Sequence, residues 1–130
     1  MTVDTFDPSA MAQPIDARLV EALCAAAVVT DDDELTLVAE DVSRFAPLAT
    51  HSDWQVLAAE LPDDKIVALI KIFTLGEMQF SSWAAADKSP VVPLVQVLKQ
   101  RGVYQSELTR WIKAHSTNRF LPHGNLLNRL

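Results

Sequence analysis

The sequence predicts an all-α fold: a single-domain helical bundle of five or six helices around a central apolar helix. Apolar residues recur with helical spacing in nearly every window, and there is no convincing run of the strict alternation typical of half-buried strands. Of the 130 residues, 49% are hydrophobic and only 3 are glycine. A chain of this length buries about two-thirds of its unfolded surface. The predicted core therefore needs no metal, cofactor or disulfide.

The central helix is predicted over residues 62–86. Pro62 suits the first helical position, where no N–H donor is needed, and Asp63 and Asp64 suit the positive end of the helix dipole. Gly76 costs about 1 kcal/mol relative to alanine in a helix interior, so a close helix crossing or a local break is expected there. Apolar side chains lie on most sides of this helix, among them Ile66, Leu69, Ile70, Phe73, Phe80 and Trp83.

The chain ahead of the central helix divides into a tail and the start of the domain. Residues 1–14 contain two prolines and no periodicity, so they predict a mobile tail, and residues 15–130 are expected to form one all-helical domain. The first helix is predicted over residues 15–29, where apolar residues share one face. A later short helix is expected to open with a capping box between Ser52 and Gln55.

An acidic run, residues 31–34, admits two interpretations. Its carboxylates are the hard oxygen ligands that calcium prefers, but an EF-hand loop needs another oxygen ligand where Leu35 stands, followed by glycine. We therefore predict that Thr30 is the N-cap of a helix with the carboxylates in its first turn. That helix is expected to end by Ala46, because Pro47 disfavours the α conformation in the residue before it.

Two further helices are predicted in the C-terminal half. One begins at Pro90 or Pro93 and ends at Gly102, which suits a left-handed cap. The other covers residues 105–115. A final apolar set is expected to form a short terminal helix, and its members are Leu126, Leu127 and Leu130.

Charge is the most uneven feature of the sequence. Residues 1–64 hold 14 of the 17 acidic residues and 2 of the 11 basic ones, a balance of −12, whereas residues 65–130 balance at +6. Such segregation predicts halves that complement each other, within one chain or across a homodimer, or a basic half that meets an anionic partner. A pI near 4.9 weighs against nucleic acid.

The predicted compartment is the cytoplasm. The single cysteine, Cys24, has no internal disulfide partner, which fits a reducing environment. The N-terminus carries Asp4 and Asp7 but lacks the positive region of a secretion signal. Residues 15–29 are too short and too charged to span a bilayer, so no membrane interaction is expected.

The candidate site for chemistry is the polar C-terminal loop and the helix start that precedes it. Its predicted members are Lys88, Ser89, His115, Asn118, Arg119 and His123. Helix N–H groups and an arginine together form an anion site, so a phosphate, sulfate or carboxylate ligand is expected if these residues meet. The alternative is that Asn118 and Arg119 hydrogen-bond loop carbonyls and tie down the C-terminal tail.

A second candidate is a helix-turn-helix formed by the two C-terminal helices. Its second helix would place Arg110 and Lys113 in the major groove of DNA. Leu98 stands where the tight crossing of the two helices usually has a small residue, and Trp111 is bulky for an inward position. An ordinary helical hairpin is therefore the favoured interpretation.

The sequence contains no phosphate loop, zincin pair, nucleophile elbow or paired-cysteine metal site. The leading hypothesis for function is a non-catalytic helical module for protein interaction or regulation, with a protein partner or a second copy of the chain. The alternatives are nucleic-acid binding through the basic C-terminal helices, and small-anion binding or catalysis at the C-terminal polar loop.

Overall fold

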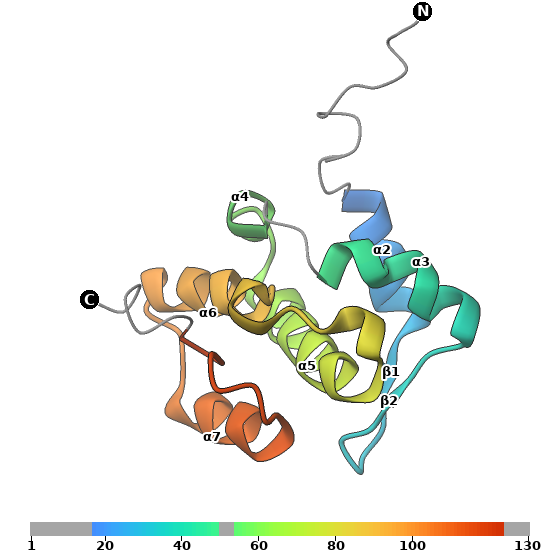
Figure 1. Cartoon of the computed structure of the whole chain (residues 1–130). Coiled ribbons are helices and arrows are strands. Elements are labelled where there is room, and N and C mark those ends of the chain that lie inside the picture. Colours follow the sequence, from blue (N-terminus) through green and yellow to red (C-terminus); the bar gives the residue numbers. More distant parts are fainter. Residues whose placement is uncertain (1–16, 50–53, 124–130) are drawn as a thin grey trace, which may run out of the picture.

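The computed structural model of the chain describes residues 17–49 and 54–123. Within these ranges the fold is mostly helical, with one short antiparallel hairpin, so the predicted all-α class is confirmed. Figure 1 shows the elements in chain order. They are α2 (Ala17–Ala26), β1 (Val28–Val29), β2 (Leu35–Thr36), α3 (Ala39–Ala49), α4 (Trp54–Ala58), α5 (Asp63–Gln79), η2 (Ser81–Trp83), η3 (Ala86–Lys88), α6 (Val91–Gln100) and α7 (Ser106–His115).

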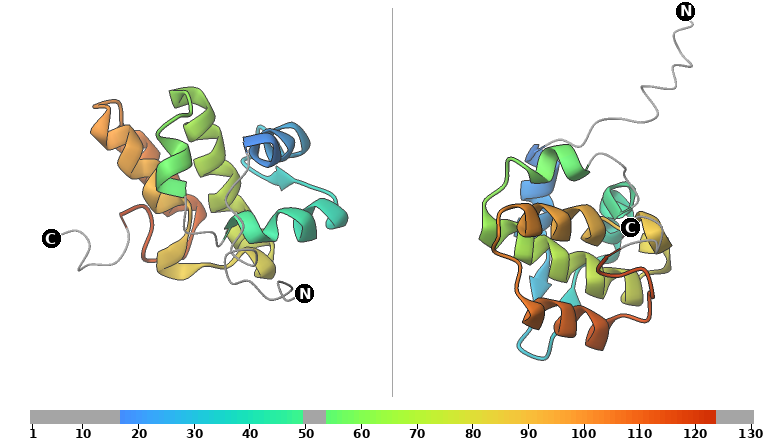
Figure 2. Two further views of the ribbon diagram at one scale, coloured as in Figure 1. Left: turned by 90° about the horizontal axis from the view of Figure 1, so that it is seen from above. Right: turned by 90° about the vertical axis from the view of Figure 1, so that its left-hand side faces the viewer.

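Helix α5 occupies the centre of the fold. Helices α6 and α7, strand β2 and the short helix η2 all pack against it, and α4 packs on α6. Seen from above in Figure 2, α5 lies between α6 on one side and α2 on the other. Its buried residues cover most of its circumference and are Ile66, Leu69, Ile70, Ile72, Phe73, Thr74, Leu75 and Gly76. None of the described helices is long and apolar enough to cross a membrane.

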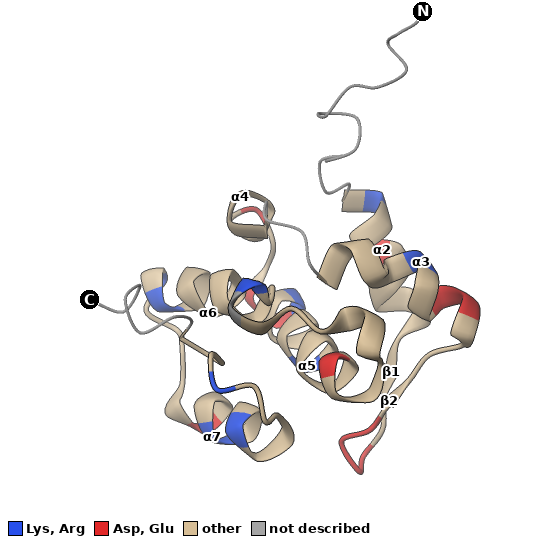
Figure 3. Ribbon diagram, in the orientation of Figure 1, with Lys and Arg blue, Asp and Glu red and all other residues tan. Residues whose placement is uncertain are grey.

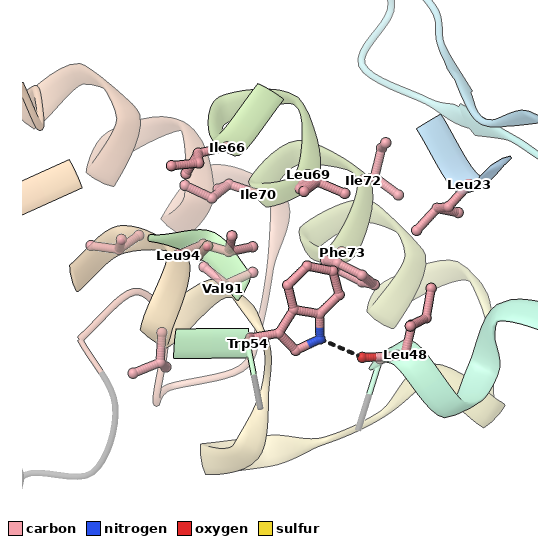
Figure 4. Close-up of a cluster of buried hydrophobic side chains, with 14 of the residues drawn as sticks. Leu23, Leu48, Trp54, Ile66, Leu69, Ile70, Ile72, Phe73, Val91 and Leu94 are labelled. Atoms are coloured by element: carbon pink, nitrogen blue, oxygen red, sulfur yellow. Dashed lines mark hydrogen bonds between the residues drawn. The ribbon is translucent and has the colours of Figure 1, made fainter. Parts of the chain in front are cut away.

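Two tryptophans meet Phe73 in the core. The Trp54 ring stands edge-on to Phe73 at 5.2 Å between centroids, and the Trp83 ring lies 5.8 Å away on a tilted plane. Figure 4 shows the Trp54 indole N–H donating to the Leu48 carbonyl at 2.7 Å. The Trp83 N–H donates to the Val42 carbonyl at 2.9 Å. The indoles therefore bury large apolar rings and leave no unpaired donor, which also fastens α3 to the core.

The central helix is shorter than predicted, because it ends at Gln79 and not at Ala86. Phe80 is extended, and η2 then turns the chain back so that Trp83 packs on α5. A Cβ atom added to Gly76 would overlap the Trp83 ring. Gly76 thus serves a close approach, as expected, and the approaching group is the indole of Trp83 on the short helix η2.

The predicted helix start at Thr30 is wrong, since this segment forms a hairpin. Val28 pairs with Thr36 and Val29 with Leu35, and the acidic run makes the turn between them. The Thr30 N–H donates to the Glu34 carbonyl at 2.9 Å, and the turn needs Asp33 at φ 58°, in the left-handed region where aspartate is tolerated. The first helix consequently ends at Ala26 and not at Val29.

Strand β2 is held by a side chain from α5. The Leu35 N–H donates to Gln79 Oε1 at 2.9 Å, and Gln79 Nε2 donates to the Leu35 carbonyl at 2.8 Å. One carboxamide therefore pairs both backbone groups of Leu35, as a neighbouring strand would. This contact spans 44 positions of the chain and fixes the hairpin against the C-terminal end of α5.

Two prolines sit inside helices, and one overturns a prediction. Helix α3 does not end by Ala46 but continues through Pro47 to Ala49. Pro47 is exposed, so the carbonyl of Ser43, which loses its helical donor, can turn to solvent. Helix α6 begins at Val91, with Pro93 in the first turn, where backbone N–H groups have no helical acceptor.

The remaining expectations are met in part. Gly102 adopts φ 72°, and the Gly102 and Val103 N–H groups donate to Lys99 and Leu98, which closes α6 with a Schellman motif. Helix α7 begins at Ser106, one residue from its predicted start. The tail at 1–14, the capping serine Ser52 and the terminal leucines lie outside the described residues.

Candidate binding groove on helix α5

The predicted C-terminal loop is tied to the core by Asn118. Asn118 Nδ2 donates to Glu77 Oε1 at 3.0 Å and to the Ala86 carbonyl at 2.9 Å. Glu77 Oε2 in turn accepts from the Ala85 N–H at 2.9 Å, and Asn118 Oδ1 accepts from the Phe120 N–H at 3.0 Å. Asn118 therefore joins the loop to α5 and η3.

The other members of the predicted anion site are engaged separately. Ser89 is buried, and its hydroxyl accepts from the Val91 N–H at 3.2 Å in the first turn of α6. The Arg119 guanidinium lies over the ring of Phe120, and Lys88 is exposed. Among the described residues no hydrogen bond or ion pair joins Arg119 to the neighbouring residues Lys88 and Ser89, so the shared anion site stays a prediction.

The two candidate histidines have different partners. His115 Nδ1 donates to the Trp111 carbonyl at 2.8 Å, and its ring stacks on the Trp111 indole at 4.3 Å. His115 Nε2 lies 3.4 Å from a carboxylate oxygen of Asp33 in the hairpin turn. His123 Nδ1 instead accepts from Lys99 Nζ at 2.7 Å. One histidine therefore links α7 to the hairpin, and the other links the loop to α6.

The helices proposed as a helix-turn-helix share α5 as their main partner. Both α6 and α7 pack on it more extensively than on each other. Arg110 and Lys113 are exposed on α7, and neither forms an ion pair within the described ranges. Arg110 and Lys113 therefore lie exposed at the surface. Helices α6 and α7 lack the tight crossing that typifies a helix-turn-helix.

The acidic and basic halves of the sequence meet within one chain. Each ion pair among the described residues joins an acid from residues 1–64 to a base from residues 65–130. The pairs are Glu21 with Lys65 at 2.8 Å, Asp63 with Arg101 at 2.6 Å, and Asp33 with His115 at 3.4 Å when the imidazole is protonated. Figure 3 shows the remaining separation, with acidic residues at the hairpin tip and basic residues on α7.

A groove that the sequence did not predict crosses the outer face of α5. One hollow of about 580 Å³ lies between α2, the hairpin and α5. A second, of about 490 Å³, lies between α5, the end of α6 and α7. Val67 and Lys71 line both hollows, which are therefore neighbours on α5. We call the two hollows together the α5 groove.

The α5 groove is lined by both apolar and polar groups, and most of its charged residues are acidic. Cys24, Ala27, Val29 and Ile72 contribute apolar surface to the first hollow, and Leu98, Leu108 and Trp111 contribute it to the second. The acidic residues that line the groove are Asp31, Asp33, Asp64 and Glu107. Lys71 is the one basic residue in the lining, and its Nζ lies 5.4 Å from the centre of the Trp111 ring.

Cys24 contributes to the apolar lining as a protonated thiol. Burial raises the pKa of the Cys24 thiol, and the nearby Lys65 ammonium offsets part of this rise. The thiol is therefore un-ionised at neutral pH and behaves as a small apolar group. Among the described residues, no three His, Cys, Asp or Glu side chains gather as a metal site would require.

Sequence reasoning missed the groove because its walls come from three distant segments. The apolar spacing of the central helix identifies Val67 as one of several apolar residues. It does not show that the neighbours of Val67 leave this side chain partly exposed. The hairpin wall was assigned to a helix. No family model, curated protein or solved structure matches the chain, so the function is argued from this geometry.

Proposed function

We propose that the protein is a non-catalytic interaction module that binds a segment of another protein in the α5 groove. The observation that carries the proposal is that two open hollows, lined by apolar and acidic residues, lie side by side at Val67 and Lys71 on the outer face of the central helix. Most of α5 is covered by its own chain, so the partly exposed strip beside that core is suited to a partner.

The packing around α5 supports a preorganised site. In this proposal the surrounding helices act as a bundle that holds the groove walls in place. Gln79 fixes the hairpin, and His115 joins it to α7, so two walls are linked before a partner arrives. A site that is already formed spends less free energy on ordering when it binds.

The ion pairs favour a different protein over a second copy as the partner. Glu21, Asp63 and Asp33 already pair with bases of the same chain. Complementarity between the halves therefore does not require a homodimer. Cytoplasmic residence, suggested by the single cysteine, forms part of the same proposal.

Site-specific photo-crosslinking in the native cell tests this function. A photo-crosslinking amino acid at Val67 is expected to capture a partner protein. The same amino acid at Val56, which is 72% exposed on α4 and lies outside the groove lining, provides the matched control. Equal capture from both positions, or none from Val67, would contradict the proposal.

A second candidate function is nucleic-acid binding by the basic C-terminal surface. Lys88, Arg110, Lys113 and Arg119 form no ion pair within the described residues, in contrast to Lys65 and Arg101. Binding to random duplex DNA or single-stranded RNA would then weaken by about one power of salt concentration for each phosphate contacted. A mobility-shift assay at low salt that shows no complex at micromolar protein would eliminate this candidate.

A further inference from the structure

We infer that the segment which binds the α5 groove is an amphipathic helix with basic residues beside its apolar stripe. The inference rests on the function proposed above and adds the conformation and charge of the partner. Three features support it: the arrangement of the two hollows, the backbone groups that the hairpin can offer, and the charges along the groove.

The arrangement of the hollows suits apolar side chains that are spaced as on one face of a helix. Val67 and Lys71, which line both hollows, are four residues and about one turn apart on α5, so the two hollows lie beside the same turn of that helix. A partner helix presents apolar residues at positions i, i+3, i+4 and i+7, with neighbours about 5–6 Å apart. In this inference the partner helix crosses α5 at that turn and places apolar residues from successive turns in the two hollows.

An extended partner has little backbone to pair with. The Leu35 backbone groups of β2 are already bonded to the Gln79 carboxamide. The other strand, β1, is two residues long, so a strand added there would gain few main-chain hydrogen bonds. A helix forms its backbone hydrogen bonds internally, so it needs only apolar and charged contacts from the groove. This difference favours a helical occupant.

The charges that line the groove favour a basic occupant. Asp31, Asp33 and Asp64 line the first hollow, and Glu107 lines the second, so acids are present at both. Lys71 is the one base in the lining and lies over Trp111. Lysine or arginine residues beside the apolar stripe of the partner would face carboxylates in both hollows, whereas acidic residues there would be repelled.

Peptide titration of the full chain tests the inference. The probe is an 18-residue peptide with leucine at i, i+3, i+4 and i+7 and lysine elsewhere. One control is a scrambled peptide of the same composition, and the other has glutamate in place of lysine. The leucine–lysine peptide is expected to bind at least tenfold more tightly than either control. Val67→Gln should weaken it at least tenfold, whereas Val56→Gln, outside the groove, should not.

Charge variants separate the groove from the general acidity of the protein. Asp31→Asn with Asp64→Asn should weaken the leucine–lysine peptide about tenfold at low salt. Glu40→Gln with Glu60→Gln removes the same charge from exposed sites outside the groove lining and should change binding less than twofold. Equal losses from the two pairs, or equal binding of the scrambled peptide, would show non-specific attraction and overturn the inference.

The remaining outcomes distinguish this inference from the function on which it rests. Preference for the leucine–glutamate peptide, together with specific crosslinking at Val67, would overturn the partner chemistry and leave the groove as a protein-binding site. Absence of crosslinking at Val67 would remove the function itself. Sedimentation that shows a dimer in the unmodified chain and a monomer in Val67→Gln would assign the groove to a second copy and overturn the inference.

Discussion

The two faces of α5 differ in their side chains and in their surroundings. On the inner face Leu69, Ile70 and Phe73 are at most 2% exposed, among helices and two indoles. On the outer face Val67 is half-buried and lines the α5 groove together with Lys71. Stability and the proposed binding site therefore depend on opposite sides of one helix. Substitutions on the two faces should therefore have separable effects.

The inner face should give the largest loss of stability. Phe73→Ala removes the ring that both Trp54 and Trp83 contact, and it leaves a cavity in the core. The free energy of unfolding should fall by about 3–5 kcal/mol. Urea denaturation measures the change, with Val56→Ala as the exposed control. A fall below about 1 kcal/mol would place the centre of the core elsewhere.

The junction of α5 with η2 tests the close approach at Gly76. Gly76→Ala would gain about 1 kcal/mol from helix propensity alone. The added methyl group overlaps the Trp83 ring, however, so overpacking should dominate and cost about 1–3 kcal/mol. Thermal or urea unfolding distinguishes the two signs. Stabilisation would mean that the indole does not rest on this turn of the helix.

The loop tie at Asn118 should have a comparable or smaller effect. Asn118→Ala removes donors to Glu77 and to the Ala86 carbonyl, and it should cost about 1–3 kcal/mol. Arg119→Ala, next in the chain, should change stability by about 0.5 kcal/mol or less, because its exposed guanidinium lies over the adjacent Phe120 ring and forms no ion pair or hydrogen bond among the described residues. A larger loss of stability from Arg119→Ala than from Asn118→Ala would mean that Arg119, and not Asn118, ties the loop to the core.

The outer face should give a smaller change in stability than the inner face. Val67→Gln gives up the apolar contact of a half-buried side chain that packs against the core, so the free energy of unfolding should fall by about 1 kcal/mol. The same variant is the one expected to lose peptide binding. If its unfolding midpoint fell as far as that of Phe73→Ala, the outer face would belong to the core and the comparison would fail.

Alkaline pH should lower the free energy of unfolding modestly, beginning with the titration of Cys24 beside the groove. Burial raises the pKa values of Cys24 and Tyr104, and the hydrogen bond to Glu21 raises the pKa of Lys65. Each shift favours the protonated form in the folded chain, so its stabilisation is complete below the ordinary pKa and is lost as pH rises through the raised one. Urea midpoints should therefore fall above about pH 8.5, the ordinary thiol value.

Removal of the thiol identifies the group responsible. In Cys24→Ala the loss should begin only near about pH 10, where tyrosine and lysine titrate. An unchanged onset in this variant would assign the first step to another group. A midpoint that rises between pH 8.5 and 9.5 in the unmodified chain would contradict the direction of the Cys24 shift.

The sequence predicted helices well where its local pattern favours a single structure. The apolar spacing from Ile66 to Phe73 identified the central helix, and Gly102 marked the end of α6. At Thr30 the same residues suit two structures, because a hydroxyl followed by carboxylates can cap a helix or form a turn. The contact that decides between them comes from Gln79, 44 positions away, which sequence spacing does not reveal.

The candidate site was harder to predict than the fold. A polar loop between apolar segments has carbonyls to satisfy, and Asn118 donates to the Ala86 carbonyl, but its bonds to the Glu77 side chain on α5 were not predicted. The α5 groove depends on where the hairpin and α7 lie relative to Val67, and tertiary packing sets that distance. Half-burial of a helix residue is a property of its neighbours, and periodicity describes only its own element.

Amide chemical-shift mapping of the isotope-labelled chain during titration with the leucine–lysine peptide is the most direct test of the division between the two faces of α5. Saturable shifts are predicted for amides around Val67 and Lys71, in the hairpin near Asp31, and near Trp111 on α7. Amides at the start of α3, which is also acidic, should stay in place. Shifts spread evenly over all acidic segments, with no saturation around Val67, would contradict a binding groove on α5.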